Sequence, residues 1–189
     1  MTSGVESAGG SPRTSSLGAD WTVGSDGVRS RRAARVILLD DAGQALLVRG
    51  HDADQPERSW WFTVGGGIDG DETPTEAALR EVREETGIVL EPGQLVGPVL
   101  TRVGIFDFYK ETCRQDEVFY AAVVPHVGPD TAGWTDVERE LLDELSWLTA
   151  DELRDQPLEY FPTVLPDVVD QLARGWDGTV RHLGTEHDD

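Results

Sequence analysis

Seven acidic residues crowd the short stretch Gly65–Val89, and three of them are Glu81, Glu84 and Glu85. At about 100° per residue along a helix, these three glutamates fall on one face. Like charges at this spacing destabilise a helix by a few tenths of a kcal/mol for each pair. A hard divalent cation such as Mg²⁺ prefers oxygen ligands and would relieve the repulsion. The spacing therefore predicts metal-assisted chemistry on this face.

The residues around the glutamates predict the helix that would carry them, over Pro74–Thr86. Thr73 can cap it together with a glutamate three positions later, as in a capping box, and proline suits the first helical position. Gly87 suits the left-handed residue that ends a helix. Arg80 and Arg83 are expected to point away from the carboxylate face. The glycines before the helix allow the backbone to approach a ligand closely, and their carbonyl groups can join a metal shell.

These residues match the Nudix box, the signature of the Nudix hydrolase family. Its pattern is a glycine, five residues, a glutamate, seven residues and then Arg-Glu-aliphatic-any-Glu-Glu-any-Gly-aliphatic. The chain supplies this pattern without mismatch at Gly66, Glu72, Arg80, Glu81, Val82, Glu84, Glu85, Gly87 and Ile88. The similarity extends over residues 32–175, with one departure beside the box, where Val64 stands in place of the proline of many members.

The resemblance implies a fold, an activity and a set of ligands. The fold would be of the α+β class, an α/β/α sandwich with a mixed sheet. The activity would be hydrolysis of a phosphoanhydride in a nucleoside diphosphate linked to another moiety. Ligands for Mg²⁺, with Mn²⁺ as a substitute, would come from Glu81, Glu84, Glu85 and the Gly66 carbonyl. Arg80 would hold the acids in place, and Glu72 would support the geometry between loop and helix.

Bound metal suits this reaction because it neutralises phosphate oxygens and lowers the pKa of the attacking water. The protein would then contribute mainly positioning and charge, through the three box glutamates and Arg80. A general base is still needed, and Glu84 is the first candidate. A glutamate from a later loop is the alternative, and reach from the site decides among Glu117, Glu138 and Glu140.

Two arginines and two tryptophans are candidates for contact with substrate. Arg49 ends a predicted strand near the glycine run, and Arg35 lies on another; both are expected to meet substrate phosphate, with a solvated arginine as the alternative. Trp60 and Trp61 are adjacent on a strand and so face opposite ways, which allows one to pack in the core and the other to stack on a base. The aromatic segment 106–109 invites the same interpretation.

Composition limits the partners. The chain has 36 acidic and 16 basic residues, so its net charge of −20 repels nucleic acid and anionic membranes. No apolar run approaches the roughly 20 residues needed to span a bilayer. A single cysteine, Cys113, makes a reducing, cytoplasmic setting the default and is expected to be a structural thiol. The expected partner is a small nucleotide substrate, and the resemblance adds a homodimer as an assembly to test.

The pattern along the chain predicts one domain with two tails. We expect a disordered N-terminal tail over residues 1–30, the Nudix domain over 31–176 and a polar C-terminal tail over 177–189. Strands are expected at 34–39, 44–50, 60–67, 98–111 and 116–127, and helices at 74–86, 150–155 and 165–176. Residues 128–140 read as a loop, and periodicity leaves 141–149 open between strand and helix.

Two other functions on this fold are considered. A catalytically silent nucleotide sensor would have a damaged box and an added DNA-binding segment, whereas this box is intact. Isopentenyl-diphosphate isomerase chemistry needs a positioned cysteine, and the surroundings of Cys113 do not resemble that motif. The sequence leaves the substrate open among nucleoside triphosphates, dinucleotide polyphosphates and nucleotide sugars. The proline typical of ADP-ribose hydrolases after the box is absent.

Overall fold

One mixed sheet forms the centre of the molecule. A computed structural model of the chain describes residues 20–52, 55–108, 111–128 and 130–188. Within them the strands run in the order β7-β3-β4-β2-β6-β5-β9, with β1 on β2 and β8 on β4. The strands are β1 Thr22–Val23, β2 Arg29–Leu39, β3 Ala45–His51, β4 Ser59–Gly67, β5 Val96–Phe108, β6 Glu111–Val123, β7 Leu142–Leu148, β8 Glu159–Phe161 and β9 Arg181–His187.

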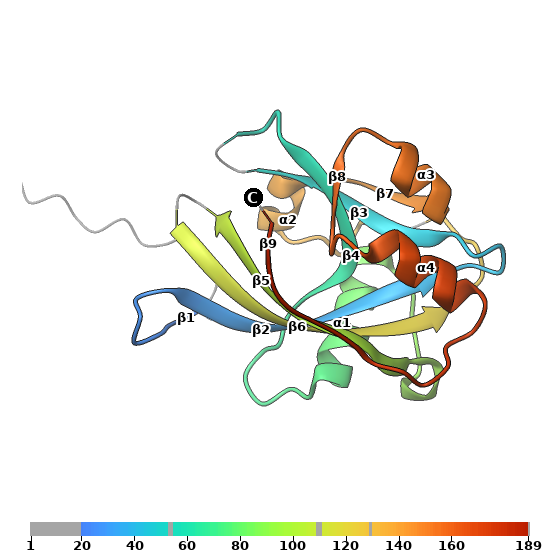
Figure 1. Cartoon of the computed structure of the whole chain (residues 1–189), viewed down its shortest axis with the longest axis horizontal. Coiled ribbons are helices and arrows are strands. Elements are labelled where there is room, and N and C mark those ends of the chain that lie inside the picture. The colour runs from blue at the N-terminus through green and yellow to red at the C-terminus, as the bar shows by residue number, and fades with distance from the viewer. Residues whose placement is uncertain (1–19, 53–54, 109–110, 129, 189) are drawn as a thin grey trace, which may run out of the picture.

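Helices cover both faces of the sheet, which gives the predicted α/β/α sandwich of the α+β class. In Figure 1, α1 lies behind the sheet while α3 and α4 lie in front of it. The helices are α1 Pro74–Thr86, α2 Asp136–Leu141, α3 Ala150–Asp155 and α4 Leu165–Ala173, with a 3₁₀ turn at Pro92–Gln94. Across the described residues, no helix is both long enough and apolar enough to cross a membrane.

The central strand β2 contributes to two cores because successive side chains point to opposite faces. Val36 and Leu38 pack with the α1 side, and Ile37 and Leu39 pack with the α3 and α4 side. β2 pairs in parallel with β6 and antiparallel with β4. The pairs β4–β8 and β5–β9 are also parallel. A strand buried on both faces reads as a continuous apolar run, as the last four residues of β2, 36–39, do.

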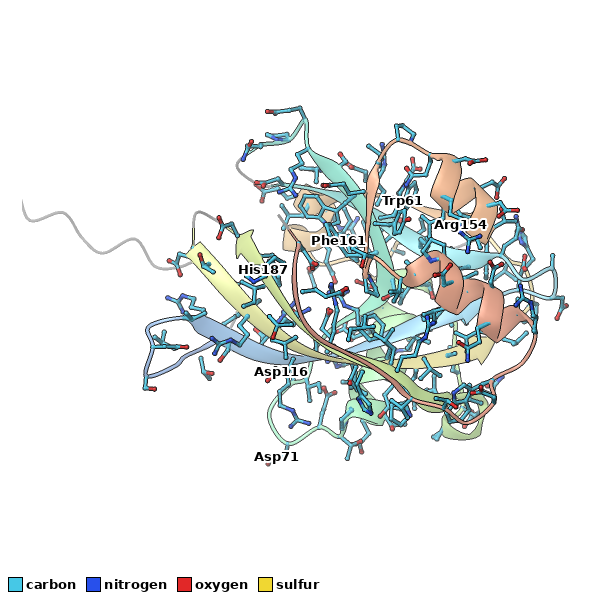
Figure 2. All side chains as sticks on the ribbon, viewed as in Figure 1. Trp61, Asp71, Asp116, Arg154, Phe161 and His187 are labelled. Atoms are coloured by element: carbon cyan, nitrogen blue, oxygen red, sulfur yellow. The ribbon has the colours of Figure 1, made fainter. Side chains whose placement is uncertain are left out.

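The helix predicted at 165–176 is present as α4, and one face of it is buried. Leu165, Pro166, Val168, Val169 and Leu172 are its buried residues. A salt-bridge cluster joins this helix to α3, because Arg154 reaches Asp167 and Asp170, each at 2.8 Å. Figure 2 shows Arg154 between the two helices. These pairs are exposed, so they orient the two helices more than they stabilise them.

Both predicted tails are wrong where the structure describes them. Residues 20–30 hold β1 and the start of β2, which pair through Thr22 and Ser30. The segment 177–189 holds β9, which pairs in parallel with β5. Neither strand shows an apolar alternation, because one is very short and the other lies at the sheet edge with polar groups on both faces. The expectation of disorder over residues 1–19 lies outside the described residues.

Three other segments differ from their predictions. Residues 112–115, expected between two strands, belong to β6, and their mixed polarity reflects alternation between the buried Cys113 and Gln115 and more exposed neighbours. The expected loop 128–140 contains the short helix α2, whose N-cap Thr135 forms a capping box with Glu138. The ambiguous segment 141–149 contains β7, which pairs with β3 at the other edge of the sheet.

Candidate active site

The helix that carries the box glutamates begins and ends at the predicted residues. Thr73 Oγ1 accepts a hydrogen bond from the backbone N–H of Glu76 at 3.2 Å, and the Glu76 carboxylate accepts one from the Thr73 N–H at 2.8 Å. Gly87 ends the helix at a φ of 72°, in the left-handed region. Ala78 and Val82 are fully buried against the sheet. This packing turns Glu81 and Glu85 toward the end of β4.

Glycines at the end of β4 allow that strand to lie directly against the glutamates. A Cβ atom on Gly66 would lie 2.6 Å from Glu81 Oε1, and one on Gly65 would lie 2.3 Å from the Ala34 carbonyl. Gly65 also has a φ of 132°, which side-chain-bearing residues rarely adopt. Its N–H donates a hydrogen bond to Glu85 Oε2 at 2.8 Å. The glycine run is therefore required for contact between backbone and carboxylates.

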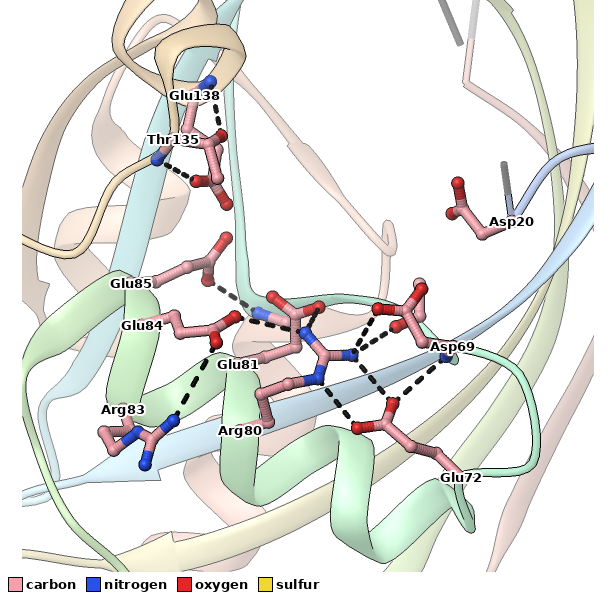
Figure 3. A network of polar contacts seen from close by, with 12 residues as sticks. Asp20, Asp69, Glu72, Arg80, Glu81, Arg83, Glu84, Glu85, Thr135 and Glu138 are labelled. Carbon is pink, nitrogen blue, oxygen red and sulfur yellow. Dashed lines mark hydrogen bonds and ion pairs between the residues drawn. The ribbon is translucent and has the colours of Figure 1, made fainter. Parts of the chain in front are cut away.

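Three carboxylates meet at this point. Glu81, Glu85 and Glu138 each offer an oxygen within 4.8 Å of the other two, and we call them the carboxylate cluster. Figure 3 shows Glu138 approaching from α2 above the two helix α1 residues. Glu84 lies beside the cluster, with its side chain 41% exposed, and accepts a hydrogen bond from Arg80 at 3.2 Å. The cluster thus joins two of the three predicted helix ligands to one of the later-loop candidates.

The electrostatics of the carboxylate cluster favour a bound cation. Burial raises the pKa of Glu81, against the effect of Arg80, and burial together with the Glu81 charge raises the pKa of Glu85 well above its ordinary value. Within the described part of the chain, no salt bridge joins a basic residue to Glu85 or Glu138. Carboxylate oxygens are the donors that Mg²⁺ prefers, so the residues present fit a hard divalent ion.

The orientation predicted for Arg80 is wrong, because Arg80 turns toward the acids. Its Nη1 donates to Glu81 Oε1 at 2.7 Å, and its Nε and Nη2 donate to the Glu72 carboxylate at 2.8 and 2.9 Å. Nη2 also donates to the Gly67 carbonyl at 2.8 Å. A long side chain lets the guanidinium group swing over the carboxylate face, which helical angle alone does not show. Arg80 thus ties loop, strand and helix together, as the resemblance implies for it and for Glu72.

A loop packed on the end of α1 positions Glu138. The backbone N–H of Asp130 donates to the Thr86 carbonyl at 2.8 Å, and Trp134 Nε1 donates to the Glu85 carbonyl at 2.9 Å. Glu138 Oε2 then accepts from the Thr135 N–H at 2.6 Å in the capping box of α2. One carboxylate oxygen is therefore fixed by the helix cap, and the side chain is held over the carboxylate cluster.

A cleft of about 530 Å³ opens above the carboxylate cluster. Arg35 lines it, and its Nη1 donates to the carbonyls of Gly65 at 2.8 Å and Thr63 at 3.2 Å. Its Nε donates to Glu117 at 2.7 Å, whereas no hydrogen bond joins its Nη2 to a described residue. A single residue, Gly65, therefore joins Arg35 to Glu85 of the carboxylate cluster, and the Nη2 of Arg35 is left as a donor for a ligand.

Arg49, the other predicted phosphate contact, does not line the cleft. It pairs with Glu144 at 3.2 Å and lies 3.9 Å from Asp143, both on β7. Its neighbours Gly50 and His51 do line the cleft. A contact between Arg49 and substrate would require this side chain to leave its salt bridges with β7.

The two tryptophans divide as the strand geometry predicts. Trp61 is buried in the core and donates from Nε1 to Gln156 at 3.1 Å. Trp60 lines the cleft with Phe62, and the Arg58 guanidinium lies 5.6 Å from the Trp60 ring centroid. Phe106 also lines the cleft. Tyr109 and the side chain of Phe108 lie outside the described residues.

The later-loop glutamates have three different environments. Glu138 belongs to the carboxylate cluster, and Glu140 is exposed on α2. Glu117 is buried between Arg35 and Arg102, which both donate to its carboxylate. Burial raises the pKa of Glu117, but the two guanidinium groups outweigh it and lower the pKa to about 2. A carboxylate so firmly paired is a structural element of the cleft floor.

We expect Glu117 to stabilise the fold in a pH-dependent way. Its pKa falls from 4.5 to about 2 on folding, so its contribution is present above about pH 4.5 and is lost as the pH falls toward 2. Glu117→Gln should lower the free energy of unfolding at pH 7 by about 3 kcal/mol or more, because the buried Arg102 and the half-buried Arg35 lose their charged partner. Urea denaturation of both proteins should show this difference shrinking between pH 4.5 and pH 2, and a constant difference would contradict it.

Several cleft residues were missed by the sequence interpretation. Asp20 and Trp21 line one end, where Asp20 pairs with Arg31 at 2.8 Å and the Arg31 guanidinium lies 4.5 Å from the Trp21 ring centroid. Asp188 lines the cleft after β9. No local motif marks these residues, and they lie in segments interpreted as tails. Only the strand pairing of β2 and β5 brings them to the cleft.

Cys113 is buried, in line with the expected structural thiol. Burial raises its pKa to about 11, so the thiol stays protonated at neutral pH. A protonated thiol is a poor nucleophile and metal ligand, which argues against cysteine-based chemistry.

Comparison with known proteins identifies the family of the chain. The NUDIX domain family matches residues 29–169. A MutT-like protein of Streptomyces ambofaciens is 31% identical over 161 residues, which cover 82% of this chain and 88% of that protein. An RNA pyrophosphohydrolase of Xanthomonas campestris is 39% identical over 62 residues, which cover 33% of this chain and 28% of that protein.

Solved structures share the fold. The crystal structure of a MutT NUDIX hydrolase from Burkholderia pseudomallei has a TM-score of 0.53 at 26% identity, covering 76% of this chain and 98% of that one. The NUDIX domain of Shewanella oneidensis NrtR, in complex with ADP ribose, has a TM-score of 0.54 at 17% identity, covering 74% of this chain and 85% of that one. The second likeness concerns the fold alone.

The chain belongs to the NUDIX domain family. The match confirms the predicted family and, with the relatives above, the predicted hydrolase class. The matched region contains the carboxylate cluster but stops short of Asp20, Trp21 and Asp188, so part of the cleft lies outside the region that defines the family.

Proposed function

We propose that the chain is a Mg²⁺-dependent pyrophosphohydrolase, with Mn²⁺ as a possible substitute, that cleaves a phosphoanhydride of a nucleoside diphosphate linked to another moiety. The observation that carries this proposal is the carboxylate cluster at the base of the cleft, which Gly65 joins to Arg35. Glu85 is buried and forms no salt bridge with a described residue, and a buried carboxylate without a basic partner is ordinarily costly and persists where a cation completes the site.

Each side chain has a role in this proposal. Glu81, Glu84 and Glu85, with the Gly66 carbonyl, would hold the metal, which when bound neutralises phosphate oxygens and lowers the pKa of a water. Arg80 holds Glu81 and Glu84 in place. The unused Nη2 of Arg35 donates to a substrate phosphate, a contact for which a planar guanidinium group is suited.

The general base is assigned between two glutamates. Glu84 is the candidate from the box, and its exposure leaves it open to solvent and substrate. Glu138 is supported by its place in the carboxylate cluster and by the helix cap that fixes one of its oxygens. The other carboxylate oxygen is then oriented for proton transfer. A general base must first meet this geometric requirement, and its pKa matters only after that.

The cleft favours a small nucleotide over a long nucleic acid. Trp60 supplies an aromatic surface on which a base can stack, and Arg35, whose guanidinium group lies 5.4 Å from the Phe62 ring centroid, lines the same cleft with Arg102. The net charge of −20 opposes association with a polyanion. We therefore propose a mononucleotide-derived or dinucleotide substrate, and a cytoplasmic location where such substrates are found.

Removal of the metal should abolish turnover. A panel of nucleoside triphosphates, nucleotide sugars, ADP-ribose and diadenosine polyphosphates would be incubated with Mg²⁺ and with EDTA, and the products separated by chromatography. We expect release of a nucleoside monophosphate or of phosphate with Mg²⁺ and none with EDTA. Among the described residues, Arg80 is the only base in a salt bridge with the carboxylate cluster, and Glu72 shares it, so the apoprotein has no free positive charge at the cluster to neutralise substrate phosphates.

The Glu84→Gln variant completes this experiment. It keeps the shape of the side chain and the acceptor for Arg80 while removing the charge. Turnover that depends on both Mg²⁺ and Glu84 would support the proposal. Full activity in EDTA would contradict it, and tight binding of one nucleotide without turnover would favour the nucleotide sensor instead.

A further inference from the structure

A second buried arginine lies on the floor of the cleft, away from the carboxylate cluster. Arg102 projects from β5, lines the cleft and is 8% exposed. Its Nε donates to Glu117, the carboxylate that it shares with Arg35. Its two terminal nitrogens donate to Asp188, Nη1 to Oδ1 at 2.8 Å and Nη2 to Oδ2 at 2.9 Å. Glu186 accepts a further hydrogen bond from Nη1 at 3.2 Å.

The pair of Arg102 with Asp188 has the geometry of phosphate recognition. Two parallel N–H···O bonds from one guanidinium group fit a carboxylate or a phosphoryl group equally well. Asp188 lines the cleft beside Arg102, so its carboxylate occupies a position that a ligand in the cleft can reach. The Asp188 carboxylate therefore occupies the position on Arg102 that an anionic group of a ligand would take.

The segment that carries Asp188 lies at the edge of the sheet. Among the described residues β9 pairs with β5 alone, and each residue of β9 is exposed or half-buried. Its register shifts opposite Thr101 and Val103, where Gly184 adopts a φ of 72°. Beyond that irregularity the pairing with β5 resumes, and the Asp188 N–H donates to the Ile105 carbonyl at 2.9 Å. Among the described residues, however, only Arg102 donates to the Asp188 carboxylate. The side chain can therefore leave Arg102 by a change of rotamer while the strand stays paired.

The charge balance also favours exchange. Burial raises the pKa of Asp188, against the effect of Arg102, so this carboxylate gains less from its partner than the two short bonds suggest. Glu117 already neutralises part of the Arg102 and Arg35 charge, and Glu186 adds another carboxylate nearby. Release of Asp188 would leave a guanidinium group facing the cleft beside Arg35.

We propose that Arg102 is an anion-binding residue of the cleft, that Asp188 occupies it in the free protein, and that a phosphoryl group of the ligand displaces Asp188. The inference rests on the proposed function in one respect, since it takes the cleft as the substrate site. It also predicts a preference among ligands. A ligand whose phosphoryl groups extend past Arg35 can contact Arg102, whereas a shorter ligand cannot.

Asp188→Asn should strengthen phosphate binding. The probe is inorganic pyrophosphate, measured by isothermal titration calorimetry in EDTA, so the result depends on neither metal nor turnover. If Asp188 leaves Arg102 in only a small fraction of molecules, removing its charge should lower the dissociation constant about 5- to 10-fold. For a hydrolysed substrate, KM should fall with little change in kcat.

Glu159→Gln is the matched control. Glu159 pairs with Arg58 at 3.2 Å, and Arg58 also lines the cleft, so both variants remove one negative charge beside a cleft arginine. The control should change the dissociation constant less than twofold, as expected for an exposed pair. An equal gain in both variants would show a general charge effect and would overturn the inference.

The double variant Asp188→Asn with Arg102→Lys locates the effect. If the tighter binding of pyrophosphate requires the two parallel hydrogen bonds of an arginine, it should disappear in the double variant, because lysine offers a single point charge. The inference would be overturned if the double variant kept the gain. It would also be overturned if Asp188→Asn bound pyrophosphate no more tightly than the wild type while its melting temperature was unchanged. Failure of hydrolysis in the substrate panel would leave this binding result standing, so the two proposals fail separately.

Discussion

Glu85→Gln should lower kcat/KM for Mg²⁺-dependent hydrolysis about 10³-fold, the scale on which loss of one preorganised charge reduces catalysis. Glu85 is 4% exposed, lies in the carboxylate cluster and is fixed by the Gly65 N–H. Glutamine can keep that hydrogen bond but not the charge that holds a cation. Steady-state kinetics on whichever substrate the panel identifies would measure the loss.

Stability separates this effect from damage to the fold. In EDTA, the melting temperature of Glu85→Gln should equal or exceed that of the wild type, because a neutral amide replaces a carboxylate whose charged form is disfavoured by burial and by Glu81. In Mg²⁺, the wild type should gain stability that the variant lacks. Activity within tenfold of the wild type would contradict the assignment of Glu85 to the metal site.

Glu138→Gln should lower kcat about 10²-fold or more, the range assigned to a general base. Glutamine at this position still completes the capping box with Thr135, so α2 should form as before. The loss would therefore report on chemistry at the carboxylate cluster and not on the helix. Single-turnover kinetics would show whether the chemical step is the one affected.

Glu140→Gln is the control on the same helix. Glu140 is exposed and two residues from Glu138, so the substitution makes the same change of charge without entering the carboxylate cluster. It should leave kcat unchanged within a factor of about two, as surface substitutions usually do. If both variants lose activity equally, the loss reflects the acidic field of α2. If neither loses activity, Glu84 is left as the general base.

Local signals in the sequence predicted the helix and its glutamates well. The caps at Thr73 and Gly87 mark the ends of α1, and burial of Ala78 and Val82 sets its rotation. Such determinants act within a few residues, so they can be read without the fold. The alternation of Trp60 and Trp61 between cleft and core is equally local, because it follows from the two-residue period of a strand.

Long-range placement could not be predicted in this way. The approach of Glu138 depends on Trp134 packing against the end of α1, some fifty positions earlier in the chain. The rotation of Arg80 onto the acids depends on Glu72 and the Gly67 carbonyl as partners, which a helical projection leaves out. Asp20 and Asp188 reach the cleft only through strand pairing, and nothing in their own segments indicates it.

The location of Asp20, Trp21 and Asp188 outside the family-matched region has a consequence for how such enzymes diverge. Flanking segments tolerate replacement more readily than the core elements that they border. The residues that border one end of the cleft can therefore change while the helix that carries Glu81 and Glu85 stays the same. If the cleft binds the substrate as proposed, substrate preference and catalysis can change independently, and grafting the two flanks onto a relative should change preference without loss of turnover.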